Sequence, residues 1–102
     1  HTRARPELIL CLALVHHLVL HENLRLPDVI DELARRDATL VIEFVDKTDP
    51  QARSLLANRN DQYSDYSQPE FERLLSDRFV IREQQSLPSG TRALYWATPR
   101  SP

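Results

Sequence analysis

Glycine is almost missing from this sequence. The 102 residues include one glycine, Gly90, whereas average usage is about 7%. Loops that cradle a phosphate or a dinucleotide need several glycines, because the backbone must turn tightly and approach the ligand closely. The chain therefore cannot build a glycine-rich loop of this kind, and no cofactor-binding residue can be assigned on that basis.

Cysteine is equally scarce. The single cysteine, Cys11, excludes an intrachain disulfide and lies within an apolar run, where a thiol usually behaves as a small buried hydrophobe. A buried thiol is inert, and no serine stands in a glycine-flanked elbow, so nucleophilic catalysis is disfavoured. One cysteine is in keeping with a reducing compartment, and we expect a cytoplasmic protein.

The sequence also lacks a strong charge of one sign and a long apolar segment. A net charge of −2 gives no field that would attract a polyanion, so nucleic acid is an unlikely partner. The apolar run from Leu8 to Leu20 is interrupted by two histidines and is shorter than the roughly 18–20 residues of a membrane span. We therefore expect no membrane insertion.

That apolar run, "LILCLALVHHLVLH", predicts the first element. Leu8–Val15 is apolar without alternation, which is typical of a strand buried on both faces of a parallel sheet. Leucine and alanine also favour helices, so a buried helix remains the alternative.

The rest of the chain predicts a single α/β domain over residues 1–102. The periodicity, caps and turns give the order strand, helix, strand, helix, helix, strand, strand. We expect two parallel strands followed by a C-terminal antiparallel hairpin, with helices packed on the faces of the sheet. After the first strand we expect a helix with Pro27 in its first turn, a strand at Thr39–Val45, and a helix that Asp49 caps and that ends near Arg59. A helix opened by the capping box of Ser67 and Glu70 follows, and then strands at Phe79–Leu87 and Arg92–Thr98.

His16 and His17 follow the first predicted strand directly. Ligands of open α/β sheets bind outside the carboxyl ends of the strands. Histidine titrates near neutral pH and serves as a hydrogen-bond partner or general base. These two residues are therefore the candidate catalytic residues, on the substrate side, and the alternative is that one caps loop carbonyls while the other is solvated.

Other side chains suggest weaker sites. His17 and His21 are four residues apart with Glu22 beside them, yet Leu18 stands where a zinc-protease motif needs glutamate, so we assign no metal ligands. Tyr63 and Tyr66 could stack on a substrate or pack against a helix.

Glu43 is a carboxylate inside an otherwise apolar strand. Such a group must be paired or lie near an open strand end. Arg92, on the last predicted strand, is one possible partner.

Several stretches, taken in order, resemble the C-terminal half of class I S-adenosylmethionine-dependent methyltransferases. The most specific are "LALVHHL", "LVIEFVDKTDPQARSLLANR" and "TRALYWA", and the resemblance runs from Leu8 to Pro99. It implies a Rossmann-like sheet in which these residues form strands 4 to 7, with the last strand antiparallel and inserted between the fifth and sixth. It also implies that His16 and His17 lie beside the transferred methyl group and its acceptor.

The chain departs from the family pattern in one respect. The glycine-rich loop and the acidic residue that hold the cofactor belong to the N-terminal half, which is absent. The resemblance implies a parent enzyme that uses S-adenosylmethionine to methylate an unidentified acceptor, and a fragment that is inactive and does not bind the cofactor tightly.

Without the N-terminal half, the first strand would lie at an open edge of the sheet. We expect this edge to pair with the N-terminal half or with a second copy of the chain in a homodimer. The alternative function is a non-enzymatic α/β interaction module that self-associates through the same strand. A third reading, a small metal-dependent hydrolase built on the histidines, would require bound zinc.

Overall fold

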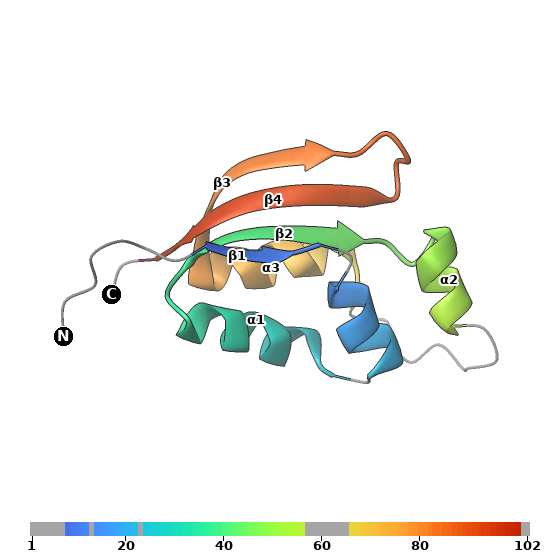
Figure 1. Ribbon diagram of the computed structural model, residues 1–102, viewed down its shortest axis with the longest axis horizontal. Coiled ribbons are helices and arrows are strands. Elements are labelled where there is room, and N and C mark those ends of the chain that lie inside the picture. Colours follow the sequence, from blue (N-terminus) through green and yellow to red (C-terminus); the bar gives the residue numbers. More distant parts are fainter. Residues whose placement is uncertain (1–7, 13, 23, 57–65, 101–102) are drawn as a thin grey trace.

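The computed structural model describes residues 8–12, 14–22, 24–56 and 66–100. They form four strands and four helices, of which the first is a π-helix (Figure 1). In chain order these elements are β1 (Leu8–Cys11), η1 (His17–His21), α1 (Leu26–Arg35), β2 (Thr39–Val45), α2 (Pro50–Leu56), α3 (Gln68–Arg78), β3 (Phe79–Ser86) and β4 (Arg92–Pro99).

The four strands form one mixed sheet in the order β1-β2-β4-β3. β1 runs parallel to β2, and β4 runs antiparallel to both of its neighbours, β2 and β3. β1, β2 and β3 therefore share one direction. The predicted α/β class, the parallel pair and the C-terminal hairpin are confirmed, and the last strand lies between the two strands that precede it in the chain.

The turns and caps predicted from sequence form as expected. Ser67 caps α3, because its hydroxyl accepts a hydrogen bond from the backbone N–H of Glu70 at 3.3 Å. Gly90 has a φ of 76° in the hairpin turn, a conformation that costs glycine little. Asp49 caps α2 by accepting from the backbone N–H of Gln51 at 2.9 Å. α2 is described as far as Leu56, and the predicted end near Arg59 lies outside the described residues.

The first strand is shorter than predicted. We expected a strand over Leu8–Val15, whereas β1 ends at Cys11 and a helical turn at Val15 leads into η1. The backbone N–H of Leu18 donates to the carbonyl of Leu14 at 3.0 Å, which begins this turn. The helical alternative is therefore correct for the second part of the run, because apolar residues without alternation can be buried in either conformation.

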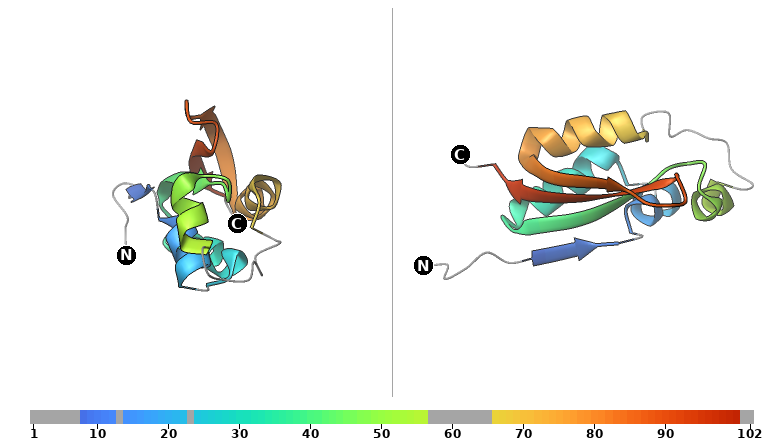
Figure 2. Two further views of the ribbon diagram at one scale, coloured as in Figure 1. Left: turned by 90° about the vertical axis from the view of Figure 1, so that its right-hand side faces the viewer. Right: turned by 90° about the horizontal axis from the view of Figure 1, so that it is seen from above.

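One face of the sheet is covered and the other is largely open. α1 and α3 pack against each other, and both lie on the same side of the sheet (Figures 1 and 2). Burial alternates along β1 and β4, and Leu10 and Trp96 on the open side are 61% and 46% exposed. The prediction of a first strand buried on both faces is therefore wrong, as is that of helices on both faces, for the described residues. β2 is buried on both faces only from Ile42 to Val45.

Aromatic rings fill the core between the sheet and α3. Phe71 of α3 is fully buried, and its ring centroid lies 5.0 Å from that of Phe44 and 5.2 Å from that of Tyr95. The Tyr95 hydroxyl donates to the Glu72 carboxylate at 2.6 Å and accepts from the Gln68 amide at 2.8 Å. These contacts attach α3 to the centre of the sheet.

The two sheet edges differ in chemistry. β1 forms one edge and carries exposed leucines, whereas β3 forms the other and is exposed and polar from Arg82 to Ser86. The register between β3 and β4 shifts between Ile81 and Glu83, so a bulge interrupts the β3 edge. Among the described residues, no helix is long and apolar enough to cross a membrane.

Candidate functional site

The segments that follow β1 and β2 come together at one end of the sheet. η1 and α2 contact each other beyond the carboxyl ends of these strands (Figure 1). The placement rule for open α/β sheets therefore identifies this end as the candidate functional site.

The two candidate histidines lie at this end but not directly after a strand. His16 belongs to the helical turn that leads into η1, five residues after the end of β1, and its side chain is fully buried. It is absent from the lining of the pocket between η1 and α1. The backbone of His17 begins η1, and its side chain lies outside the described part of the structure. The catalytic role of both residues remains a prediction.

Asp49 and Arg92 form the central ion pair of the site. Asp49 lies in the loop after β2 and Arg92 begins β4, 43 residues later, and the Arg92 Nε donates to Asp49 Oδ2 at 2.9 Å. Arg92 Nη2 donates to Asp49 Oδ1 at 3.2 Å, so the contact is bidentate. The Thr91 hydroxyl adds a bond of 2.6 Å to Asp49 Oδ2. These bonds fasten the start of β4 to the loop that follows β2.

Glu43 joins the same network, as the sequence suggested. Its Oε2 lies 3.6 Å from Arg92 Nη1, and its side chain is 8% exposed. Arg92 therefore lies between two buried carboxylates. With its guanidinium engaged by both carboxylates, Arg92 is suited to holding the site together rather than to binding an anion.

The lowered pKa of Asp49 makes the stability of the fold depend on pH in a predictable direction. The hydrogen bonds from Arg92 hold the pKa of the Asp49 carboxyl well below its ordinary value of 3.8. A depressed pKa in the folded state contributes stability that is complete above the unfolded-state pKa and is lost as the pH falls. We expect the stability difference between the wild type and Asp49→Asn to be constant at neutral pH and to shrink by about 1 kcal/mol by about pH 3.

Urea unfolding at a series of pH values measures this difference. Asp77→Asn is the matched control, because it makes the same change in an exposed ion pair. The Asp77 side chain is 64% exposed, and its Oδ2 lies 3.7 Å from Arg73 Nη1. A difference for Asp49→Asn that stays unchanged down to pH 3 would contradict the assignment.

Tyr66 packs into the core instead of facing a ligand. It is 2% exposed, stacks on Phe44 with a centroid distance of 4.9 Å, and donates a 2.6 Å hydrogen bond to the carbonyl of Val45. Burial raises the pKa of its hydroxyl. Tyr66 therefore packs in the core as the alternative held, although its ring stacking and its hydrogen bond are with β2 and not with a helix. Tyr63 lies outside the described residues.

Cysteine chemistry is disfavoured at this end of the sheet. Cys11 is a buried free thiol, and burial raises its pKa, which disfavours the reactive thiolate. Within residues 8–12, 14–22, 24–56 and 66–100, no group of three or more histidine, cysteine, aspartate or glutamate side chains is arranged to hold a metal ion. The side chains of His17 and His21 lie outside that description.

Sequence reasoning missed the main partner of Arg92. Asp49 was predicted only as a helix cap, because Asp-Pro is a common helix start. Its second role depends on the fold, which brings the loop after β2 beside the start of β4. Glu43, a carboxylate in an apolar strand, was the one sequence signal that pointed to this cluster.

Comparison with known proteins relates the chain to part of a longer protein. It is 33% identical over 94 residues to nodulation protein NoeA of Rhizobium meliloti (strain 1021). The alignment covers 92% of this chain and 20% of that protein, so the chain spans about a fifth of the relative's length. No family model and no solved structure matches the chain.

Proposed function

We propose that this chain is the C-terminal part of a class I S-adenosylmethionine-dependent methyltransferase domain, whose parent enzyme methylates an unidentified acceptor. The observation that carries the proposal is the sheet: three strands share one direction, and the last strand runs against them between β2 and β3. This arrangement is what the resemblance in sequence implies for strands 4 to 7. The similarity to a fifth of a longer protein supports the idea of a segment.

The edge position of β1 gives the proposal a second support. β1 pairs with β2 on one side, and Leu8 and Leu10 are 59% and 61% exposed. An apolar edge strand is a liability in an isolated domain and is normally paired or covered. A strand from an N-terminal half would extend the sheet at this edge.

Two features of the described residues bear on whether this chain could hold the cofactor by itself. Gly90, the one glycine, lies in the hairpin turn before β4, and the pocket between η1 and α1 is lined mainly by aliphatic side chains. Neither feature suits the methionine and ribose portions of S-adenosylmethionine. The contribution of this chain would be to complete the sheet and to place residues near the acceptor.

The isolated chain should therefore fail to bind the cofactor. We expect isothermal titration calorimetry of the 102 residues with S-adenosylmethionine to give no binding in the micromolar range, because the loops that hold the cofactor are not part of this chain. The longer parent protein is the matched positive control. Micromolar binding to the 102 residues alone would contradict the proposal.

The histidines are tested separately in the intact parent. Class I transfer depends chiefly on positioning, with a base where the acceptor carries a proton. Replacing His16 or His17 by glutamine, with turnover measured against pH, distinguishes a base from a packing residue, since loss of a base removes the pH dependence near neutrality. Unchanged turnover after replacement by alanine would remove the catalytic role.

The exposed β1 edge also favours a second candidate function, a non-enzymatic module that self-associates or completes a partner's sheet. Size-exclusion chromatography with light scattering separates the two functions. A dimer that persists on dilution and dissociates when Leu10 is replaced by lysine supports the module. A chain that is monomeric when dilute and associates without a defined size when concentrated supports the methyltransferase segment.

A further inference from the structure

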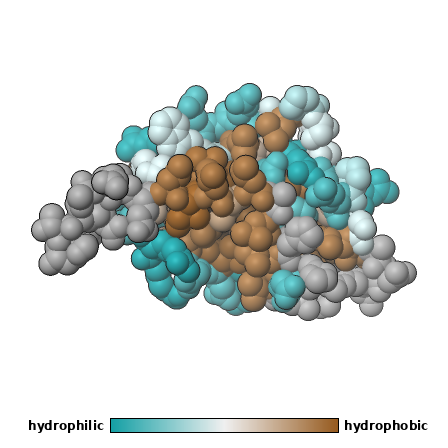
Figure 3. Space-filling model, in the orientation of Figure 1, coloured by the Kyte–Doolittle hydropathy of each residue, from teal (hydrophilic) through white to brown (hydrophobic). Residues whose placement is uncertain are grey.

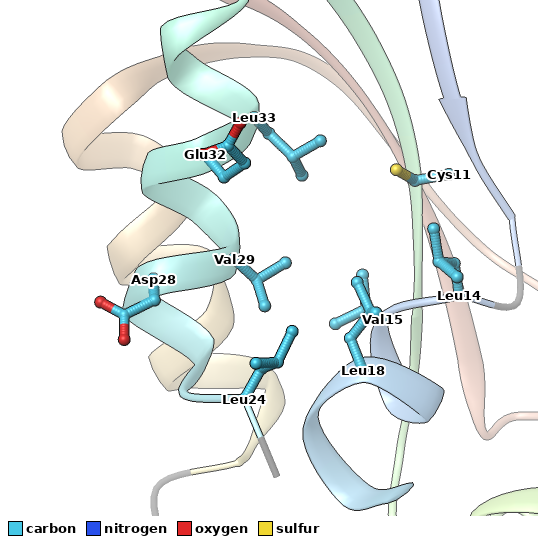
Figure 4. A pocket seen from close by; sticks show the side chains of 9 residues that line it. All are labelled: Cys11, Leu14, Val15, Leu18, Leu24, Asp28, Val29, Glu32 and Leu33. Carbon is cyan, nitrogen blue, oxygen red and sulfur yellow. The ribbon is translucent and has the colours of Figure 1, made fainter. Parts of the chain in front are cut away.

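An apolar groove lies between η1 and α1. It holds about 160 Å³ of open space, and Cys11 at the end of β1 contributes to its floor. From α1, Val29 and Leu33 point across the gap toward Val15 and Cys11 (Figure 4). The described residues that line it are Cys11, Leu14, Val15, Leu18, Leu24, Asp28, Val29, Glu32 and Leu33.

The groove continues an exposed apolar surface. Leu12, Leu14 and Leu24 are 54%, 40% and 47% exposed. Figure 3 shows the hydrophobic colour spreading over the face of the molecule that carries β1 and the helices beneath it. Exposed apolar surface that is contiguous and concave marks an interaction site, because covering it releases about 25 cal/mol per Å².

The size and walls of the groove fit side chains that project from a helix. A cavity of roughly 150 Å³ accommodates a group about as large as benzene, so the groove can take one large aliphatic or aromatic side chain. Two helical walls with an apolar floor form the usual receptor for an amphipathic helix, which inserts anchors spaced at i, i+3, i+4 and i+7.

The acidic residues of α1 beside the groove favour a partner helix that carries basic residues next to its apolar face. Asp28 and Glu32 are four residues apart on α1 and border the groove, and Asp28 points away from its apolar lining (Figure 4). Glu32 binds Arg35 at 2.5 Å and Arg36 at 3.4 Å, whereas Asp28 has no ion pair among the described residues. Asp28 is therefore available to a cation from a partner.

We propose that this groove binds a basic amphipathic helix, with its aliphatic anchors between η1 and α1 and a lysine or arginine beside Asp28. The groove lies between η1 and α1 and includes only the last residue of β1, Cys11. The proposal therefore does not depend on strand pairing at the β1 edge or on membership of the methyltransferase family.

A designed peptide tests the proposal directly. The probe is a labelled amphipathic helix of roughly 18 residues with leucines at the anchor positions and lysines on one flank, and a second probe carries glutamates in place of the lysines. Binding to the complete chain is measured by fluorescence anisotropy at two salt concentrations. We expect the lysine probe to bind at least tenfold more tightly than the glutamate probe, and more weakly in high salt.

Variants locate the site of binding. Leu14→Ser and Leu24→Ser change exposed groove residues and should each weaken the lysine probe about tenfold, and Asp28→Asn should reduce the preference for lysine. Trp96→Ser is the matched control, because Trp96 is 46% exposed on the open sheet face. Circular dichroism confirms that each variant folds.

Four outcomes would overturn the proposal. They are failure of the lysine probe to bind, equal binding of both probes, equal weakening by Trp96→Ser and the groove variants, and occupation of the groove by a second copy. The last is recognised by sedimentation, as a dimer that Leu24→Ser converts to monomer.

Discussion

Replacing Arg92 by leucine is expected to lower the free energy of unfolding by about 3–5 kcal/mol. Arg92 is the shared partner of Asp49 and Glu43, whose side chains are 4% and 8% exposed. Removing the cation takes from both poorly solvated carboxylates the guanidinium that they share. The loss is larger than that of a surface ion pair, which contributes about 0–1 kcal/mol.

Urea denaturation followed by circular dichroism measures this loss. Arg82→Leu is the matched control, because it makes the same change on the neighbouring strand β3, where the Arg82 Nε donates to the Thr98 hydroxyl at 2.9 Å in an exposed position. We expect the control to lose less than about 1 kcal/mol. Equal losses for the two variants would show that the cluster adds nothing to stability beyond a surface contact.

Replacing Phe71 by alanine is the second change with a large expected effect, also about 3–5 kcal/mol. The Phe71 ring is fully buried between Phe44 and Tyr95. Alanine removes the buried apolar surface and leaves a cavity that the surrounding strands cannot close, because the sheet fixes their positions. The ring contacts that Phe71 of α3 makes with Phe44 and Tyr95 of the sheet are lost.

The total stability of a small domain is only about 5–15 kcal/mol, so Phe71→Ala can unfold the chain. Phe71→Leu keeps most of the volume and provides the graded measurement, with an expected loss below about 1.5 kcal/mol. Leu74→Ala is the control on the same helix, because Leu74 is only partly buried. A loss for Phe71→Ala no greater than for Leu74→Ala would contradict the central position of the ring.

Elements with strong local signals were predictable from the sequence. Ser67 with Glu70 three residues later predicted the start of α3, and β2 has the predicted bounds Thr39–Val45. In these segments the cap chemistry and the β-branched residues act over a few positions, so no knowledge of the tertiary fold is needed.

The segment after Cys11 was not predictable in the same way. Leucine, alanine and valine can be buried in a strand or in a helix, and the available partner decides between them. β1 pairs with only the first four residues of β2, after which the chain turns into η1. The strand prediction failed where this pairing ends.

The candidate site was predictable only in its general location. The rule for open sheets points to the end where η1 and α2 meet, and that location stays a prediction. The apolar context of Glu43 indicated a buried partner, and Arg92 Nη1 lies 3.6 Å from its carboxylate. The contact between Asp49 and Arg92 joins residues 43 positions apart. No local pattern encodes a contact of that range, because it depends on β4 lying between β2 and β3.

The bulged, polar edge strand β3 restricts assembly through strand pairing to the opposite edge of the sheet. Charged side chains and a bulge disfavour pairing of β3 with another strand, so we expect new strands to add beside β1. In a dimer joined through β1, the outer edge of each copy would be its own β3 strand. Growth would end at a closed pair, which protects the chain from polymerising into fibres.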